Sequence, residues 1–369
     1  MKNCLILIVL ISFFSCKKEP NNSTSTEKFK VLNYLEKIME KEGIPGLQVT
    51  VIKNNKIILS ENLGIANVPF SVAVKENTIF SINSIAKVFA STAILQLEER
   101  NKLVLSDSIS KHISNLPNKW RSITIRQLLS HTSGLPDIED PYKDELIGGK
   151  GQYSAWVAVQ KMPLQFKSGE EFNYNATNYL LIQKIIEKHG NVPFEEFVKT
   201  NQFDVAGMKQ TIYGNSFDVK ENKSPTYCYY YKDKTTGEDI KGTNLIEVNE
   251  EFPTNLRADA GVFTTANEMA KWVISLQSGK LLQKASIDKM WTPVKLNNGK
   301  YGDFTGILNT YALGWPVIKR EKHLGVSPFG GGRASFTIYP KDNLSIILFT
   351  NLSGIPTYEM VDEISKFYF

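Results

Sequence analysis

The order of strand and helix patterns along this 369-residue chain is the feature that most constrains its fold. Two segments near the N-terminus and three in the C-terminal third have the β-branched, apolar character of strands: 47–52, 56–63, 311–317, 334–339 and 344–350. The middle of the chain is mostly helix-patterned. We therefore expect an α+β fold, in which an antiparallel sheet is assembled from both ends of the chain and a mostly helical subdomain, over about 107–250, is inserted between the sheet-forming segments.

Helix patterns also occur at both ends of the folded region. Residues 28–44 carry an amphipathic stripe, and residues 357–368 are predicted to form the last helix. We expect these terminal helices to flank the sheet. A site would then lie where the sheet meets the helical part, since pockets commonly form at such seams.

The N-terminus has the features of a targeting segment. Lys2 precedes a short apolar run from Leu5 to Phe14, which fits the core of a signal peptide. The following Ser15-Cys16 resembles a bacterial lipoprotein processing site. We expect residues 1–15 to be a lipoprotein signal peptide, Cys16 to carry the lipid anchor, residues 16–27 to be a flexible tether, and residues 28–369 to be one domain. This implies a bacterial cell envelope location (periplasm or outer membrane), or secretion if Cys16 is not lipidated.

Composition excludes several classes of protein. The full chain has a net charge of +5 and no long basic run, which argues against nucleic-acid binding. Only Cys16 and Cys228 remain after removal of the signal peptide, so no disulfide framework is expected. The four histidines show no close metal-ligand spacing, and we expect no metal and no cofactor; they are His112, His131, His189 and His323.

A Ser-x-x-Lys sequence, Ser84 to Lys87, opens the apolar, helix-patterned segment 88–97. Residues three apart on a helix lie on one face, so the hydroxyl and the amine can meet within one turn. A lysine that is desolvated at a buried helix start can be neutral enough to accept the proton of a serine nucleophile. The same four residues are also compatible with an ordinary helix start.

Several further segments, in the same order, make the chain similar to a known family. It resembles the serine β-lactamase and penicillin-binding-protein superfamily, in its class C-like branch, over roughly residues 30–369. The resemblance implies a β-lactamase/transpeptidase-like fold and hydrolysis of small molecules or short peptides through an acyl-enzyme on Ser84, without a cofactor. The segments that carry it are 78–87, 123–136, 168–174 and 259–265.

The second motif of the family, Tyr-x-Asn, is altered here to Tyr174-Asn175-Ala176. By resemblance, Tyr174 coupled to Lys87 would be the general base and would later return a proton to the leaving group. The asparagine that steadies the lysine and contacts the substrate amide is replaced by Ala176. Either Asn175 or Asn178 could substitute, and without such a substitute amide substrates should suffer more than esters.

The third motif, Lys-Thr-Gly or His-x-Gly in the family, has two possible registers. One is His323-Leu324-Gly325; the other runs from Pro328 to Gly332, which the spacing to the next strand favours. In the second register Gly330 and Gly331 would form the oxyanion strand, where backbone must approach the substrate closely. Arg333 would partly compensate for the missing cation.

His131 and the tyrosine-rich segment 227–231 each allow a functional and a structural interpretation. His131 invites a Ser–His–Asp interpretation, but the matching histidine of the family is structural, and the chain contains no Gly-x-Ser-x-Gly elbow. The tyrosine-rich segment 227–231 either covers the cleft or is a half-buried edge strand.

The sequence thus predicts an exported serine hydrolase with catalytic residues Ser84, Lys87 and Tyr174, acting on esters or on small amides or peptides. A peptidoglycan D-amino-acid peptidase or a β-lactamase is an alternative enzyme. A binding lipoprotein of the same fold with little turnover is an alternative of another class, because Ala176 and the altered third motif depart from the family pattern.

Overall fold

The computed structural model describes residues 22–140, 145–149, 151–233, 236 and 238–369. Its main sheet is antiparallel and follows the order β11-β12-β13-β15-β16-β1-β2-β3, with β14 paired to β15. The bounds of its strands are β1 Gly46–Lys53, β2 Lys56–Asn67, β3 Val72–Ala73, β11 Thr310–Tyr311, β12 Pro316–Ile318, β13 Gly325–Val326, β14 Phe329–Gly330, β15 Ala334–Tyr339 and β16 Leu344–Thr350.

The two ends of the chain meet in the centre of this sheet. Strand β1 pairs with β16 from Leu47 opposite Thr350 to Lys53 opposite Leu344. Strands β1 and β2 are joined at Asn54-Asn55, and both asparagines have positive φ, as a tight hairpin turn requires. The expected sheet from both ends of the chain is confirmed.

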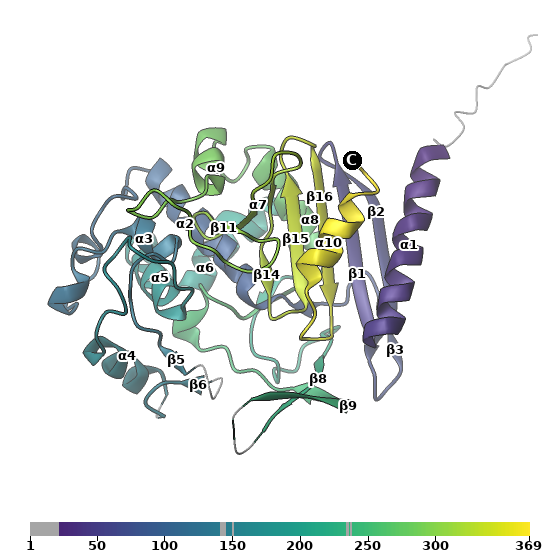
Figure 1. Cartoon of the computed structure of the whole chain (residues 1–369), viewed down its shortest axis with the longest axis horizontal. Helices are drawn as coiled ribbons and strands as arrows, with labels where there is room; N and C mark the ends of the chain where they lie inside the picture. Colours follow the sequence, from purple (N-terminus) through teal and green to yellow (C-terminus); the bar gives the residue numbers. More distant parts are fainter. Residues whose placement is uncertain (1–21, 141–144, 150, 234–235, 237) are drawn as a thin grey trace, which may run out of the picture.

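Helices cover both faces of the sheet (Figure 1). Alternate β1 residues, Leu47, Val49 and Val51, share one apolar core with α1 (Asn22–Glu42) and α10 (Thr357–Ser365). Helix α8 (Ala266–Gln277) packs against β1 and β16, and its side of the sheet faces the larger core. The expected flanking of the sheet by terminal helices is confirmed.

The remaining elements form the part beside the sheet. Helix α2 (Ala86–Glu99) runs through the larger core and packs against α5, so the nucleophile segment has a rigid support. The other bounds are α3 Ile125–Leu129, α4 Gln152–Lys161, α5 Ala176–Gly190, α6 Phe194–Val198, α7 Asp204–Ala206, α9 Lys284–Trp291, β4 Phe80–Ser81, β5 Glu139–Asp140, β6 Glu145–Leu146, β7 Ile212–Tyr213, β8 Thr226–Lys232, β9 Asp239–Val248 and β10 Val262–Thr264.

Four expected boundaries are wrong. Helix α1 begins at Asn22, so residues 22–27 are helical rather than tether, whereas residues 1–21 lie outside the described residues. The inserted part is not mainly helical to 250, because β8 and β9 form an antiparallel hairpin there. The expected strand 311–317 is two strands, since Gly314 adopts a φ of +84° and turns the chain. Helix α10 ends at Ser365 rather than at 368.

Candidate active site

Ser84 lies in a short 3-10 turn, Asn83–Ile85, that leads directly into α2. The side chains that follow it, from Ala86 to Leu97, are all buried, which fixes the start of the helix. Ser84 itself is half-buried and lines a cleft of about 1330 Å³. The serine is thus held on a rigid element with its hydroxyl open to a cavity, as a nucleophile requires.

Lys87 lies one turn below the serine. Its Nζ donates to Ser84 Oγ at 3.3 Å, and the residue is only 2% exposed. The predicted meeting of the hydroxyl and the amine is therefore present in the structure. A buried amine at this distance can exchange a proton with the hydroxyl without moving the backbone.

Asp259 is a partner of Lys87 that sequence reasoning missed. Its carboxylate Oδ1 lies 2.7 Å from Lys87 Nζ, and its backbone oxygen accepts from the same amine at 3.3 Å. The side chain is 7% exposed and lines the cleft. Residue 259 belongs to one of the family-like segments, but a carboxylate that precedes a short strand gives no sign in the sequence that it will reach the lysine.

Tyr174 completes this group. Lys87 Nζ lies 4.6 Å from the centre of the Tyr174 ring, and the ring centre of His131 lies 4.3 Å from it. Desolvation of this half-buried side chain, and after it the negative charge of Asp259, raise the pKa of Tyr174 well above its ordinary value, while a hydrogen bond with Ser84 acts in the opposite direction.

The residues after Tyr174 do not replace the missing asparagine of the second motif. Asn175 is the N-cap of α5: its Oδ1 accepts from Asn178 N–H, and its amide donates to Leu135 O at 3.0 Å. Asn178 is bound to Ser133 and His131. The expected substrate contact of Asn175 is therefore wrong for its side chain, which holds the loop together.

The glycines of the third motif lie beside the nucleophile. A Cβ atom on Gly330 would lie 2.0 Å from Ile82 O and 2.8 Å from Ser84 N, so only glycine fits there. Gly331 and Gly332 follow with φ values of +55° and +54°. Of the two possible registers of the third motif, the one from Pro328 to Gly332 is therefore the one that lies beside Ser84, because its strand β14 packs against the serine turn.

Arg333 does not face a substrate. Its guanidinium is 1% exposed, donates to Glu250 Oε2 at 2.6 Å and also reaches Ser81. The expectation that it would compensate for the missing cation is wrong, because its donors already have partners within the fold.

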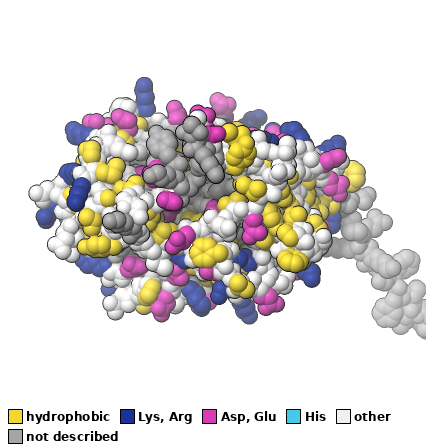
Figure 2. Space-filling view, turned by 90° about the horizontal axis from the view of Figure 1, so that it is seen from below, with side chains coloured by type: hydrophobic (Ala, Val, Ile, Leu, Met, Phe, Trp, Pro, Cys, Tyr) yellow, Lys and Arg dark blue, Asp and Glu magenta, His cyan; other side chains and the backbone are white. Residues whose placement is uncertain are grey.

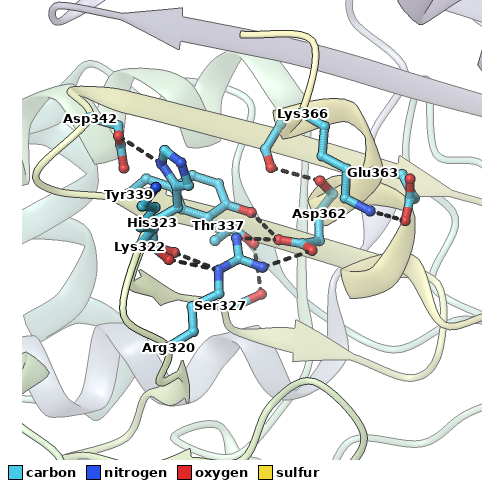
Figure 3. A network of polar contacts seen from close by, with 11 residues as sticks. Arg320, Lys322, His323, Ser327, Thr337, Tyr339, Asp342, Asp362, Glu363 and Lys366 are labelled. Carbon is cyan, nitrogen blue, oxygen red and sulfur yellow. Dashed lines mark hydrogen bonds and ion pairs between the residues drawn. The ribbon is translucent and has the colours of Figure 1, made fainter. Parts of the chain in front are cut away.

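His323, the alternative third-motif residue, belongs to a different network (Figure 3). Its Nδ1 lies 2.9 Å from Asp342 Oδ1, in the turn between β15 and β16, and its ring stacks on Phe369. In the same network Arg320 and Tyr339 both bind Asp362 of α10. This histidine therefore joins its loop to the β15–β16 turn and to the C-terminal residue Phe369, and it is not a site residue.

His131 is enclosed below Tyr174. It is fully buried, and Asn175 N–H donates to its Nδ1 at 3.2 Å. Burial, followed by the charge of Lys87, keeps the pKa of His131 well below its ordinary value. It is a neutral ring that supports the tyrosine.

The tyrosine-rich segment turns out to be both a strand and a wall of the cleft. Within β8 and β9, the residues that line the cleft include Tyr230, Tyr231 and Ile246. Cys228 lies here as a free thiol. Sequence alone could not place the hairpin, because its position depends on contacts with distant loops.

The described part of the chain shows neither a metal centre nor a membrane-spanning helix. No group of three His, Cys, Asp or Glu side chains there could hold a metal ion. Among its helices, none combines the length and the apolar character needed to cross a membrane.

Comparisons with known proteins show the family and the fold of this chain. A model of the family named Beta-lactamase matches residues 31–366. The chain is 26% identical over 355 residues to protein flp of Staphylococcus aureus (strain N315), covering 93% of this chain and 66%, just under two thirds, of flp. It is 28% identical over 351 residues to PbpX of Bacillus subtilis (strain 168), covering 92% of this chain and 77% of PbpX. A solved class C beta-lactamase in complex with cefoxitin shares the fold, with a TM-score of 0.74 at 19% identity. The match covers 93% of this chain and 99% of that one.

Proposed function

Because this chain belongs to the beta-lactamase family of serine hydrolases, we propose that it hydrolyses small acyl compounds through a covalent acyl-enzyme on Ser84. The observation that carries this proposal is the 3.3 Å contact between Lys87 Nζ and Ser84 Oγ at the wall of a large cleft. A serine hydroxyl next to a buried amine is an activated nucleophile.

The proposed reaction uses these groups in turn. Ser84 Oγ attacks the acyl carbon, and its proton passes to the pair formed by Lys87 and Tyr174. The bond to the leaving group then breaks, and Tyr174 returns the proton to that group. In the second half of the cycle, water loses a proton to the same pair and attacks the ester on Ser84; the bond to Ser84 Oγ then breaks, the pair returns the proton to Oγ, and the acid is released. The N–H groups of Ser84 and Gly331 stabilise the oxyanion in both halves.

We propose esters as the preferred substrates. The side chain of Ala176 cannot hydrogen-bond a substrate amide, Asn175 is engaged elsewhere, and Arg333 is paired with Glu250. A buried polar group that is left without a partner costs about 1–3 kcal/mol. Each missing contact should therefore handicap β-lactams and D-alanyl peptides by roughly tenfold to a hundredfold relative to neutral esters, at about 1.36 kcal/mol per decade.

One panel of substrates separates the proposed esterase from its alternatives. These are a peptidase or β-lactamase of the same mechanism, and a binding protein with little turnover. We expect the specificity constant for a short-chain nitrophenyl ester to exceed those for nitrocefin and a D-Ala-D-Ala peptide. Ala176→Asn should raise the nitrocefin-to-ester ratio. A wild type that prefers nitrocefin, or a ratio unmoved by Ala176→Asn, would contradict the assigned preference.

A further inference from the structure

Asn83, the residue before the nucleophile, has a backbone conformation that few side chains adopt. Its φ is +46°, in the left-handed region that favours glycine and that asparagine tolerates better than most residues. The residue is half-buried and lines the cleft next to Ser84. Figure 2 shows a hollow in the middle of one face, with acidic side chains around it. Since glycine would fit this backbone with less strain, the asparagine side chain is a candidate for a function of its own.

Both ends of the Asn83 amide are occupied. Its Nδ2 donates to Glu250 Oε1 at 3.2 Å, and its Oδ1 accepts the hydroxyl of Ser84 at 3.3 Å. The other oxygen of Glu250, Oε2, accepts from Arg333 at 2.6 Å, and Arg333 also donates to Ser81 Oγ at 3.1 Å. A chain of three side chains therefore leads from a buried guanidinium to the nucleophile.

Glu250 determines which end of the Asn83 amide faces the nucleophile. The two ends of an amide have nearly the same shape, so their hydrogen-bond partners decide how the group is oriented. A carboxylate in a salt bridge accepts hydrogen bonds and does not donate them, so Glu250 selects the NH₂ end of Asn83. The oxygen Oδ1 is left facing Ser84, where it can accept a proton but cannot supply one.

The Ser84 oxygen can use this acceptor only while it carries its proton. Lys87 Nζ donates to Ser84 Oγ, and the hydroxyl donates to Asn83 Oδ1. Acylation forms the bond from Oγ to the acyl carbon, breaks the bond to the leaving group and passes the hydroxyl proton through Lys87 and Tyr174 to that group. The ester oxygen of the acyl-enzyme then faces a second acceptor with no proton between them. The contact returns only when water has removed the acyl group and Oγ has regained a proton.

We propose that Asn83 is a positioning residue that stabilises the free serine relative to the acyl-enzyme and so limits accumulation of the acyl-enzyme. This inference rests on the proposed hydrolase function and deepens it. A contact that is present in the free enzyme and lost in the transition state slows the step that breaks it, which here is acylation. Deacylation starts without the contact, so it is not slowed. Because 3.3 Å is long for a hydrogen bond between two oxygens, we expect a modest effect.

Asn83→Gly tests the side chain without straining the turn, because glycine adopts this φ readily. Water that takes the place of the amide can donate as well as accept, so it does not disfavour the ester oxygen. With 4-nitrophenyl acetate, stopped-flow kinetics gives the acylation rate constant from the burst and the deacylation rate constant from the steady phase. We expect the ratio of acylation to deacylation to rise by about threefold to tenfold, the size of one neutral hydrogen bond. A side chain that merely supports the serine would instead lower acylation, and an unchanged or lower ratio would overturn the inference.

Two further variants locate the effect. Asn101→Gly changes another asparagine of positive φ, at an exposed position outside the cleft lining, and should leave the ratio unchanged. Glu250→Gln presents an amide that can donate or accept, so it no longer selects one end of Asn83, and the ratio should rise as in Asn83→Gly. A Glu250→Gln variant with a native circular dichroism spectrum and the wild-type ratio would contradict the fixed orientation. If this variant does not fold, Asn83→Gly alone decides.

The intact mass during turnover separates this inference from the hydrolase function. We expect an acetyl adduct on Ser84 in a larger fraction of Asn83→Gly chains than of wild-type chains at the same ester concentration. Equal fractions would contradict the inference and leave the hydrolase function intact. A wild type with neither a burst nor an adduct would defeat the hydrolase function, and this inference with it.

Discussion

At the residue scale, Ser84, Lys87 and Tyr174 act as one proton path. The amine contacts the hydroxyl at 3.3 Å and lies over the tyrosine ring at 4.6 Å. Lys87→Ala and Tyr174→Phe should each lower kcat/KM for an ester by at least about a hundredfold, the usual size for a lost general base. The double variant should be hardly worse than either single one, since both serve the same transfer.

Steady-state kinetics of the two single variants and the double variant measures this coupling. Lys280→Ala and Tyr153→Phe, at exposed positions, are matched controls and should keep wild-type constants. Losses that multiply in the double variant would show two independent roles and would refute the shared path.

Asp259 should set the pH at which the enzyme becomes active. Burial, and after it the negative charge of Asp259, raises the pKa of Tyr174, so removal of that charge lowers it. If attack needs the deprotonated phenol, activity rises with pH through this pKa. Asp259→Asn should then move the rising limb of the kcat/KM profile to lower pH and also lower its maximum, because Lys87 loses its partner. An unmoved limb would mean that Tyr174 does not titrate in the rate-determining step.

The residue scale also shows where sequence reasoning stops. The Ser84–Lys87 contact could be predicted because a helix fixes the geometry of residues three apart. The Asp259 contact could not, because it joins segments 172 residues apart. Similarly, only the structure reveals that Arg333 is occupied by Glu250 and Asn175 by the cap of α5.

At the element scale, β14 must approach the serine turn very closely. Gly330→Ala would place a methyl group 2.0 Å from Ile82 O, and backbone on both sides leaves little room to adjust. We expect this variant to lose ester hydrolysis and labelling by a fluorophosphonate. Gly299→Ala is the control for a strained backbone without a steric clash, because its φ is +80° and nothing lies within 4 Å of the added carbon.

Circular dichroism distinguishes the two ways in which Gly330→Ala could fail. A native far-UV spectrum with lost labelling places the effect at the site, as expected. A variant that folds normally and still labels at the wild-type rate would show that β14 does not have to contact the serine turn.

Elements with a strong local signal were predicted well. The hairpin at Asn54-Asn55 and strands β15 and β16 follow from apolar patterns and turn residues. The β8–β9 hairpin was not predicted, because its strands are half-exposed and their irregular register gives no clean alternation. The break within 311–317 depends on one glycine conformation at Gly314.

At the scale of the whole molecule, the first and last strands are neighbours in the sheet. This arrangement was predictable because strand patterns at both ends have few other ways to bury their apolar faces. How the inserted segments enclose the cleft was not predictable, since many weak long-range contacts determine it together. The family resemblance predicted the placement of the nucleophile.

We propose that Cys16, which lies outside the described residues, anchors the protein to a bacterial membrane through lipid. Cys16→Ser should then move the protein from the membrane fraction to the soluble exported fraction, because one residue carries the whole attachment. Cys228→Ser, which removes the other remaining cysteine, should not change the distribution. Mass spectrometry that finds an unmodified residue 16, or cleavage elsewhere, would leave a secreted enzyme instead.

The most direct test of the central claim is the intact mass of the protein after reaction with a fluorophosphonate. The probe forms a stable bond with an activated serine, so it reports the nucleophile without knowledge of the natural substrate. The account predicts one adduct per wild-type chain, located on Ser84, and none on a folded Ser84→Ala variant. Stoichiometric labelling of Ser84→Ala, or an adduct on another residue of the wild type, would contradict it.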